Sequence, residues 1–292
     1  MVKAGRTGRG VDGKPGKRYE LTDDGWERIT PLLPTQKRGG KWAEHRTVLN
    51  GMFWVLNSGA QWRDMPERYG KWETIYGRYR RWTREGLFGR ILNALHVSLD
   101  QEGRIDWSVF DVDGSNIRAH RSAAGAARRS KKTDDEPRDH ALGRSRGGFG
   151  TKLHLVTDRV GTPLGALVTA GQGHESVSFE ALMDTVGVRG QGGRRRPDAV
   201  AGDKGYSYPR IRRWLRRRGI QAVIPTRSNQ PRERLDTAKY RGRNAVERCI
   251  GWLKGCRRVA TRYEKLATHF LAVVTLAIIQ RCLRLLDPSN RT

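Results

Sequence analysis

The chain has 292 residues and carries 57 Lys and Arg against 30 Asp and Glu, a formal net charge of +27. Its length allows one large or two medium domains with a real buried core. So large a positive excess repels itself in a folded protein, and it indicates a polyanionic partner. Nucleic acid is the first candidate for that partner, and an anionic membrane surface is the second.

The apolar and cysteine patterns argue against a membrane protein or a secreted one. The longest apolar run, residues 270–279, is too short to span a bilayer and is typical of a buried helix. Residues 1–18 are basic but lack an apolar segment behind them, so they predict a flexible arm rather than a secretory signal. Cys249, Cys256 and Cys282 have neither the number nor the spacing of a zinc site or a disulfide framework. We expect reduced core thiols in a cytoplasmic protein.

Residues 19–100 predict an all-helical domain. A first helix opens with Thr22 as its cap, and a second apolar run at helical spacing ends at Gly59. After a turn-rich segment, a third helix carries an aromatic stripe with basic residues interleaved. This order is typical of a helix-turn-helix module whose second helix lies in a major groove of DNA. An ordinary helical bundle with a solvated basic face fits the pattern equally well. The interleaved cations are Arg78, Arg80, Arg81 and Arg84.

From residue 104 onward, strands and helices alternate. We expect a strand around 109–113, a hairpin over 151–171, and short strands at 198–202 and 220–226. Helices are expected between these strands, and a final helix over about 266–286. The mixture predicts an α/β domain with a mixed sheet. The small, charged and glycine-rich segment 122–150 is interpreted as a mobile loop that meets DNA.

Two aspartates stand where predicted strands give way to glycine, in Asp113-Gly114-Ser115 and Asp203-Lys204-Gly205. Functional sites in such sheets gather at the carboxyl ends of strands. The alternative for either aspartate is an ordinary turn former. Asp111 shares a strand face with Asp113, so spacing alone does not choose between them. We favour Asp113 because it lies where the strand ends in the predicted pattern.

A single acid, Glu247, lies among cations near the end of the chain. On one helix, Tyr240, Arg243, Glu247 and Lys254 would fall within an arc of about 60°. The opposite side of this helix is apolar and suits a core face. A solvated stripe with an (i, i+4) ion pair is the plain interpretation of this pattern.

These motifs together resemble a known family. The spacing of Tyr240, Arg243, Glu247 and Lys254 matches the Y-R-E-K signature of the DDE transposases of bacterial insertion sequences. The stretches "DGSNIRAH" and "AGDKGY" resemble the motifs around that family's first and second aspartates. The helical front resembles the insertion-sequence-five-like branch, and the resemblance covers roughly residues 19–285. Four motifs in the right order are far more specific than any one of them.

The resemblance implies a ribonuclease-H-like catalytic core, here at 104–287. It also implies a DNA transposase that binds the terminal inverted repeats of its own insertion sequence. Such an enzyme cleaves and transfers the DNA strands of that element. Carried over, the catalytic and metal-binding triad is Asp113, Asp203 and Glu247. Two Mg²⁺ or Mn²⁺ ions are implied, and oxygen-only ligands suit either ion. The resemblance also implies a homodimer that binds the two paired ends of the element and the target DNA, within the bacterial nucleoid. The expected DNA contacts are Arg243 and Lys254 on phosphates, Tyr240 on a base or sugar, and Arg78, Arg80, Arg81 and Arg84.

Two other functions remain open at this stage. A non-catalytic DNA-binding protein, either a regulator or a decayed transposase, would share the charge and the helical front but would not need an intact triad. A metal-dependent nuclease on the same fold would share the triad but would not need the transposase-type helical domain. The histidines that invite a metal-binding reading lack ligand spacing; they are His120, His140, His154 and His174.

Overall fold

The computed structural model describes residues 18–35, 40, 42–124, 140–188 and 196–287. The predicted arm, except for Arg18, and the middle of the predicted loop 122–150 lie outside these residues. The helical front is confirmed. Its helices are α1 (Asp23–Ile29), α2 (His45–Ser58), α3 (Trp72–Arg84) and α4 (Leu87–Gln101).

Local sequence signals set the ends of these helices. The Thr22 hydroxyl accepts a hydrogen bond from the Gly25 N–H at 3.2 Å and caps α1. Gly59 ends α2 and Gly86 separates α3 from α4, each with a positive φ that glycine adopts without strain. The connection from Gly59 to Lys71 contains two 3₁₀ turns. It is therefore longer than the three- to four-residue turn of a helix-turn-helix module.

The sheet is mixed, as the sequence predicts. Its path runs β4–β3–β1–β5–β6, with β3 antiparallel to β1 and β4, and with β5 and β6 parallel to β1. This is the arrangement expected of a ribonuclease-H-like core. The strands are β1 (Val109–Ala119), β2 (Gly143–Ser145), β3 (Gly148–Asp158), β4 (Pro163–Ala170), β5 (Ala199–Ala201), β6 (Gln221–Val223) and β7 (Thr261–Arg262).

Two strand predictions are wrong. The first strand does not end at Asp113 but continues to Ala119, because β3 pairs with it residue by residue as far as Arg118. The predicted loop 122–150 includes β2 and the start of β3, which pair with each other through residues 143–145 and 148–150. Backbone hydrogen bonding to neighbouring strands overrides the turn-forming composition at both places.

The helix predicted across residues 240–256 is broken in two, α7 (Thr237–Arg241) and α8 (Asn244–Gly255). The Arg159 guanidinium donates to the carbonyl oxygens of Lys239 and Ala238 at the end of α7. It also fills the space that a side chain at position 242 would occupy. The break therefore requires both Gly242 and a residue from the end of β3, which the local sequence does not reveal.

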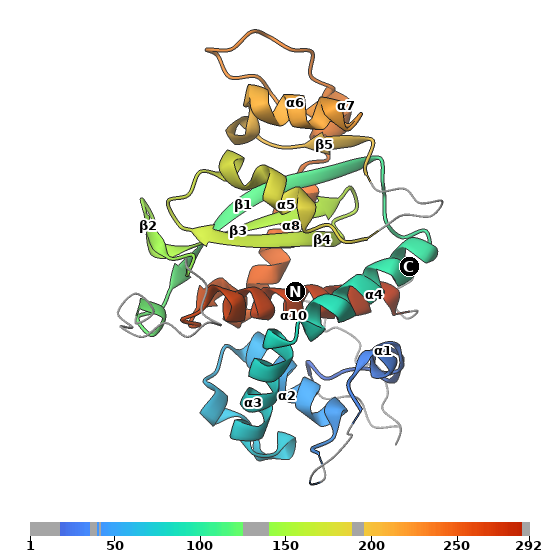
Figure 1. Cartoon of the computed structure of the whole chain (residues 1–292), viewed down its shortest axis with the longest axis vertical. Coiled ribbons are helices and arrows are strands. Elements are labelled where there is room, and N and C mark those ends of the chain that lie inside the picture. Colours follow the sequence, from blue (N-terminus) through green and yellow to red (C-terminus); the bar gives the residue numbers. More distant parts are fainter. Residues whose placement is uncertain (1–17, 36–39, 41, 125–139, 189–195, 288–292) are drawn as a thin grey trace, which may run out of the picture.

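The remaining helices are α5 (Phe179–Asp184), α6 (Pro209–Arg217), α9 (Arg257–Ala260) and α10 (Ala267–Leu286). Figure 1 shows α10 passing between the sheet and the N-terminal helices α2 and α3. Among the described residues, α10 is the one helix long and apolar enough to cross a membrane, but 67% of its most apolar window is buried. It is the predicted core helix. Buried residues of α2, α3, α4, α10 and the sheet belong to one hydrophobic cluster, so both halves of the chain share a core.

Gly150 offers a test of the β1–β3 pairing. A Cβ at Gly150 would lie 2.3 Å from the Ile117 carbonyl oxygen, whereas a Cβ at Gly147 in the same hairpin would meet only the Ser145 hydroxyl at 3.7 Å. We expect Gly150→Ala to lower the free energy of unfolding by about 1–3 kcal/mol, because a backbone atom must move. Gly147→Ala should change it by less than about 0.5 kcal/mol. Urea denaturation measures both, and equal effects would contradict the described register.

Candidate active site

The parallel pairing of β1 with β5 brings two of the predicted site residues to one level of the sheet. Val109 pairs with Ala199, and the register continues to Asp111 with Ala201. Asp113 lies two residues after Asp111 in β1, and Asp203 lies two residues after Ala201, the last residue of β5. Asp203 is close enough for its charge to raise the pKa of Asp113. Two acids that are 90 residues apart in the sequence therefore lie together where β5 ends.

Local backbone contacts hold both carboxylates. The Asp203 side chain caps the 3₁₀ turn that follows it and accepts a hydrogen bond from the Gly205 N–H at 2.7 Å. The Asp113 Oδ1 accepts from the Gly114 N–H at 2.9 Å. Asp203 is thus also a turn former, as the alternative interpretation held, and this role fixes its carboxylate at the strand end.

Burial raises the pKa of Asp113 to about 6, because its surroundings disfavour the charged form. The Gly114 N–H and the Arg243 guanidinium oppose this rise, while the negative charges of Glu175 and Asp203 add to it. The carboxylates at this position therefore repel one another in a poorly solvated environment. A nearby cation is needed to offset the repulsion.

Arg243 supplies that positive charge and links Asp113 to Glu247. Its Nη1 lies 3.8 Å from Asp113 Oδ2, and its Nη2 forms an ion pair with Glu247 Oε1. Glu247 lies in the first turn of α8, and 51% of its side chain is exposed. Lys254, two turns further along α8, donates to Ser115 Oγ at 2.8 Å and to the Asn116 carbonyl at 3.4 Å. These contacts join α8 to β1 beside the acids.

Sequence reasoning missed a fourth acid, Glu175. It forms an ion pair with Lys152 at 3.2 Å, and its charge raises the pKa of both Asp113 and Tyr206. A Cβ at Gly114 would lie 2.7 Å from Glu175 Oε1, so the glycine after Asp113 makes room for this carboxylate. No motif surrounds Glu175, and only the folding of the 3₁₀ turn Glu175–Ser178 against β1 brings it here.

Asp111, which spacing could not separate from Asp113, lies inside the protein. Its exposed fraction is 0%, and neither carboxylate oxygen has a hydrogen-bond partner among the described residues. Burial raises its pKa to about 7, although Arg159 and Arg243 lower it. Asp113 is 19% exposed at the open edge beyond β5. The difference in accessibility favours Asp113 as the residue that meets a ligand.

The predicted DNA-contact residues fall into two groups. Arg78 is buried, donates to His45 Nδ1 at 2.8 Å, and lies over the rings of Trp42 and Trp82. Burial lowers its pKa, and it is part of the core of the helical front rather than a surface contact. Tyr240 is half-buried on α7, with Arg243 above its ring at 5.9 Å. The cations exposed on α3 are Arg80, Arg81 and Arg84.

The acids suit a hard divalent cation by donor chemistry, because carboxylate oxygens are the ligands that Mg²⁺ and Mn²⁺ prefer. Within the described ranges, however, no three His, Cys, Asp or Glu side chains are close enough together to hold a metal ion. The Arg243 guanidinium lies between Asp113 and Glu247 instead. The carboxylate oxygens are therefore suitable ligands for a divalent metal ion. In the described structure, the positive charge beside Asp113 and Glu247 comes from Arg243.

Comparison with known families identifies the class. Residues 106–280 match the model of the "Transposase DDE domain", and residues 21–92 match the "Putative transposase of IS4/5 family". The chain therefore belongs to the DDE transposases, enzymes that cleave and transfer DNA strands and that use a divalent metal. Within that family it is a transposase of the insertion-sequence type, as the four motifs predict. Neither alternative function is favoured by these matches.

Individual relatives agree with this assignment. The chain is 37% identical over 154 residues to the "Putative transposase for insertion sequence element IS402" of Burkholderia cepacia, which covers 52% of this chain and 68% of that protein. It is 33% identical over 138 residues to the "Putative transposase for insertion sequence element IS6501" of Brucella ovis, covering 46% and 98%. A solved pre-cleavage Mos1 transpososome aligns over 85% of this chain and 81% of its own at 11% identity. The TM-score of that alignment is 0.28.

The buried Asp111 should make stability depend on pH. An aspartate whose pKa in the folded state is raised stabilises the fold while protonated, and this contribution is lost as pH rises from about 4 through about 7. Asp111→Asn removes the cost of ionisation. We therefore expect the free energy of unfolding of the variant to exceed that of the parent by about 1–4 kcal/mol at about pH 8. At about pH 4 the two should differ little.

Urea denaturation at the two pH values measures this difference. Asp184→Asn, which changes an exposed acid at the end of α5, is the control. An Asp111→Asn effect of equal size at both pH values would show that ionisation is not its cause.

Proposed function

We propose that Asp113, Asp203 and Glu247 form the catalytic triad of this transposase and hold two Mg²⁺ or Mn²⁺ ions. The observation that carries the proposal is the β1–β5 register. Asp111 pairs with Ala201, and Asp113 and Asp203 each lie two residues beyond that pair. The ion pair of Glu247 with Arg243, which also contacts Asp113, supports the third member. When bound, the ions would activate a water or a 3′-hydroxyl and stabilise the leaving oxygen of an in-line phosphoryl transfer.

The protein's own cations have defined parts in this proposal. Arg243 offsets the negative charges of Asp113 and Glu247. With metal ions bound by the acids, its guanidinium would be available to hold a DNA phosphate. Lys254 is anchored on Ser115 and Asn116 beside the same strand, where it holds the phosphate backbone near Asp113. Tyr240 stacks on a base or sugar next to Arg243.

The DNA substrate is proposed to be the element's terminal inverted repeats and its target site, bound by a homodimer on paired ends in the nucleoid. Arg81 and Arg84 on the exposed side of α3 are proposed to contact phosphates. Arg78 is left out of this set because it is buried. The net charge of +27 supplies the sequence-independent part of the affinity.

Neutralising the acids tests the triad. We expect Asp113→Asn, Asp203→Asn and Glu247→Gln each to reduce Mg²⁺-dependent cleavage of the element's ends by about 100-fold or more, because several kcal/mol of charge stabilisation are lost. Binding of the same DNA should stay within about threefold of the parent, since no phosphate contact is removed. Asp111→Asn is the matched control and should retain cleavage. Cleavage that survives Glu247→Gln would remove Glu247 from the triad.

Salt dependence tests the cations of α3. The double variant Arg81→Ala, Arg84→Ala should weaken duplex binding on every sequence and reduce the slope of log K against log salt by about 2, or about 1 for each lost phosphate contact. Arg90→Ala removes an exposed cation from the neighbouring α4 and should leave the slope unchanged. Fluorescence anisotropy over a salt series measures it. An unchanged slope in the double variant would place the phosphate contacts elsewhere.

A further inference from the structure

Glu175 lies beside the proposed triad, and the proposed function does not use it. Its side chain packs against Gly114, where a Cβ would lie 2.7 Å from Glu175 Oε1 and 2.8 Å from Glu175 Cδ. The N–H of the same glycine donates to Asp113 Oδ1. Glu175 is 20% exposed and Asp113 19%, so solvent reaches both side chains to the same degree. An accessible carboxylate therefore lies against the residue that holds the Asp113 carboxylate.

Contacts on two sides fix the 3₁₀ turn that carries Glu175. The His174 Nδ1 caps the turn and accepts a hydrogen bond from the Ser176 N–H at 3.3 Å. The Arg210 guanidinium, from α6, donates to the Ser176 carbonyl oxygen. The fold thus sets the position of the carboxylate, and little ordering cost opposes the binding of a ligand there.

A buried phenol, that of Tyr206, indicates a ligand at the same place. Its residue is 0% exposed, and its hydroxyl has no hydrogen-bond partner among the described residues. Burial raises the pKa of Tyr206 well above its ordinary value, and the negative charges of Glu175, Asp113 and Asp203 raise it further. A buried donor without an acceptor is unfavourable. The hydroxyl therefore lies among three carboxylates with its donor available to an oxygen in the site.

The balance of charge also favours a fourth acid. Two divalent ions carry four positive charges, whereas Asp113, Asp203 and Glu247 supply three negative ones. Glu175 supplies the fourth. In the described structure Lys152 Nζ lies 3.2 Å from Glu175 Oε1 and provides a positive charge there. A simple ion pair with Lys152 would account for that contact, but it would leave the buried phenol unexplained.

We propose that Glu175 is a fourth carboxylate ligand of the divalent-metal site, and that the Tyr206 hydroxyl donates a hydrogen bond to an oxygen beside the ion. This inference rests on the proposed triad, which it extends by one acid. Carboxylate oxygens suit Mg²⁺ and Mn²⁺, and a hydrogen bond to the ligand oxygens strengthens such a site.

The test measures Mn²⁺ binding to the full-length protein without DNA, from the electron paramagnetic resonance signal of free Mn²⁺. We expect Glu175→Gln, which keeps the shape of the side chain, to weaken binding about 10- to 100-fold. Glu180→Gln is the matched control and should bind as the parent does. Glu180 belongs to α5, and it too pairs with a basic residue, Arg210, at 3.5 Å.

Salt separates a lost ligand from a lost charge. At about 1 M salt the Debye length is about 3 Å, so the effect of a charge that acts only through space should shrink. We expect the loss in Glu175→Gln to persist at this salt concentration. A loss that disappears would overturn the role of Glu175 as a ligand, and so would parent-like binding by Glu175→Gln at low salt.

Tyr206→Phe removes the hydroxyl but keeps the ring, which packs edge-on against Phe179 at 5.9 Å. We expect this variant to weaken Mn²⁺ binding about 10-fold. The free energy of unfolding of the metal-free protein should not fall, because no hydrogen bond is lost there. Unchanged Mn²⁺ binding together with a less stable fold would show that the hydroxyl has a purely structural role.

The triad variants distinguish a failure of this inference from a failure of the proposed function. If the triad is correct, Asp203→Asn and Glu247→Gln will weaken Mn²⁺ binding. Binding that survives both changes would overturn the triad and the fourth acid with it. If those two variants lose Mn²⁺ while Glu175→Gln binds as Glu180→Gln does, the triad stands and the inference about Glu175 is wrong.

Discussion

The acidic site depends on the contacts that the positively charged Arg243 makes with Asp113 and Glu247. Burial of Asp113 raises its pKa, and the negative charges of Glu175 and Asp203 raise it further. One guanidinium between Asp113 and Glu247 offsets the repulsion and also joins α8 to the central strand. The proposed contact of this arginine with a DNA phosphate starts from the same position, beside Asp113 and Glu247.

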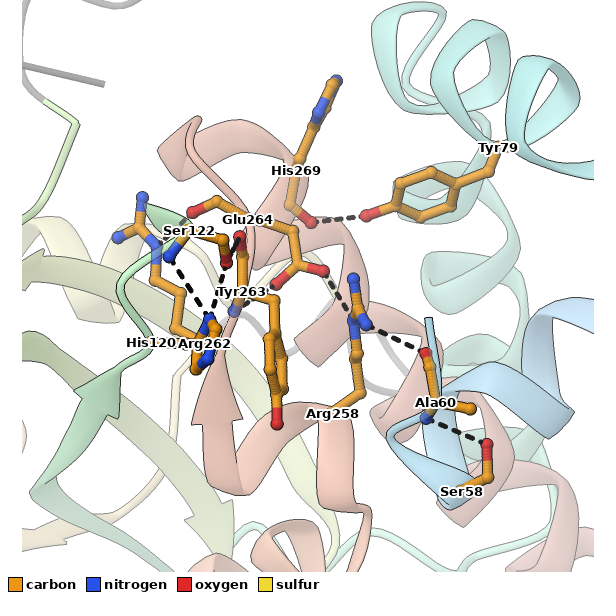
Figure 2. A network of polar contacts seen from close by, with 10 residues as sticks. All are labelled: Ser58, Ala60, Tyr79, His120, Ser122, Arg258, Arg262, Tyr263, Glu264 and His269. Carbon is orange, nitrogen blue, oxygen red and sulfur yellow. Dashed lines mark hydrogen bonds and ion pairs between the residues drawn. The ribbon is translucent and has the colours of Figure 1, made fainter. Parts of the chain in front are cut away.

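The second constraint is the shared core around α10. This helix packs between the sheet and the N-terminal helices, and buried residues of all three belong to one hydrophobic cluster. The helical front is therefore no loosely tethered DNA-binding module, since removing it would expose a large apolar surface on α10. A polar contact joins the same two halves, since Arg258 donates a hydrogen bond to the Ala60 carbonyl at 3.0 Å (Figure 2).

Much of the fold was predictable because its signals are local. Thr22 and Gly59 mark helix ends, alternating apolar residues mark the strands, and the apolar run at 270–279 marks a buried helix. Errors arose where a distant segment decided the outcome. Pairing with β3 extends β1 past Asp113, and Arg159 breaks the helix at Gly242. Arg78 looked like a surface cation but is enclosed by Trp42 and Trp82.

The sequence by itself determined the residue types of the site and their order along the chain, because motif spacing is a property of the linear sequence. Tertiary structure alone decided which carboxylates meet. The β1–β5 register brings Asp203 to Asp113, burial separates Asp111 from Asp113, and a 3₁₀ turn adds Glu175. These outcomes depend on the pairing and packing of segments far apart in the chain. Both the desolvation and the Coulomb interactions of a carboxylate follow from that packing, and not from its neighbours in sequence.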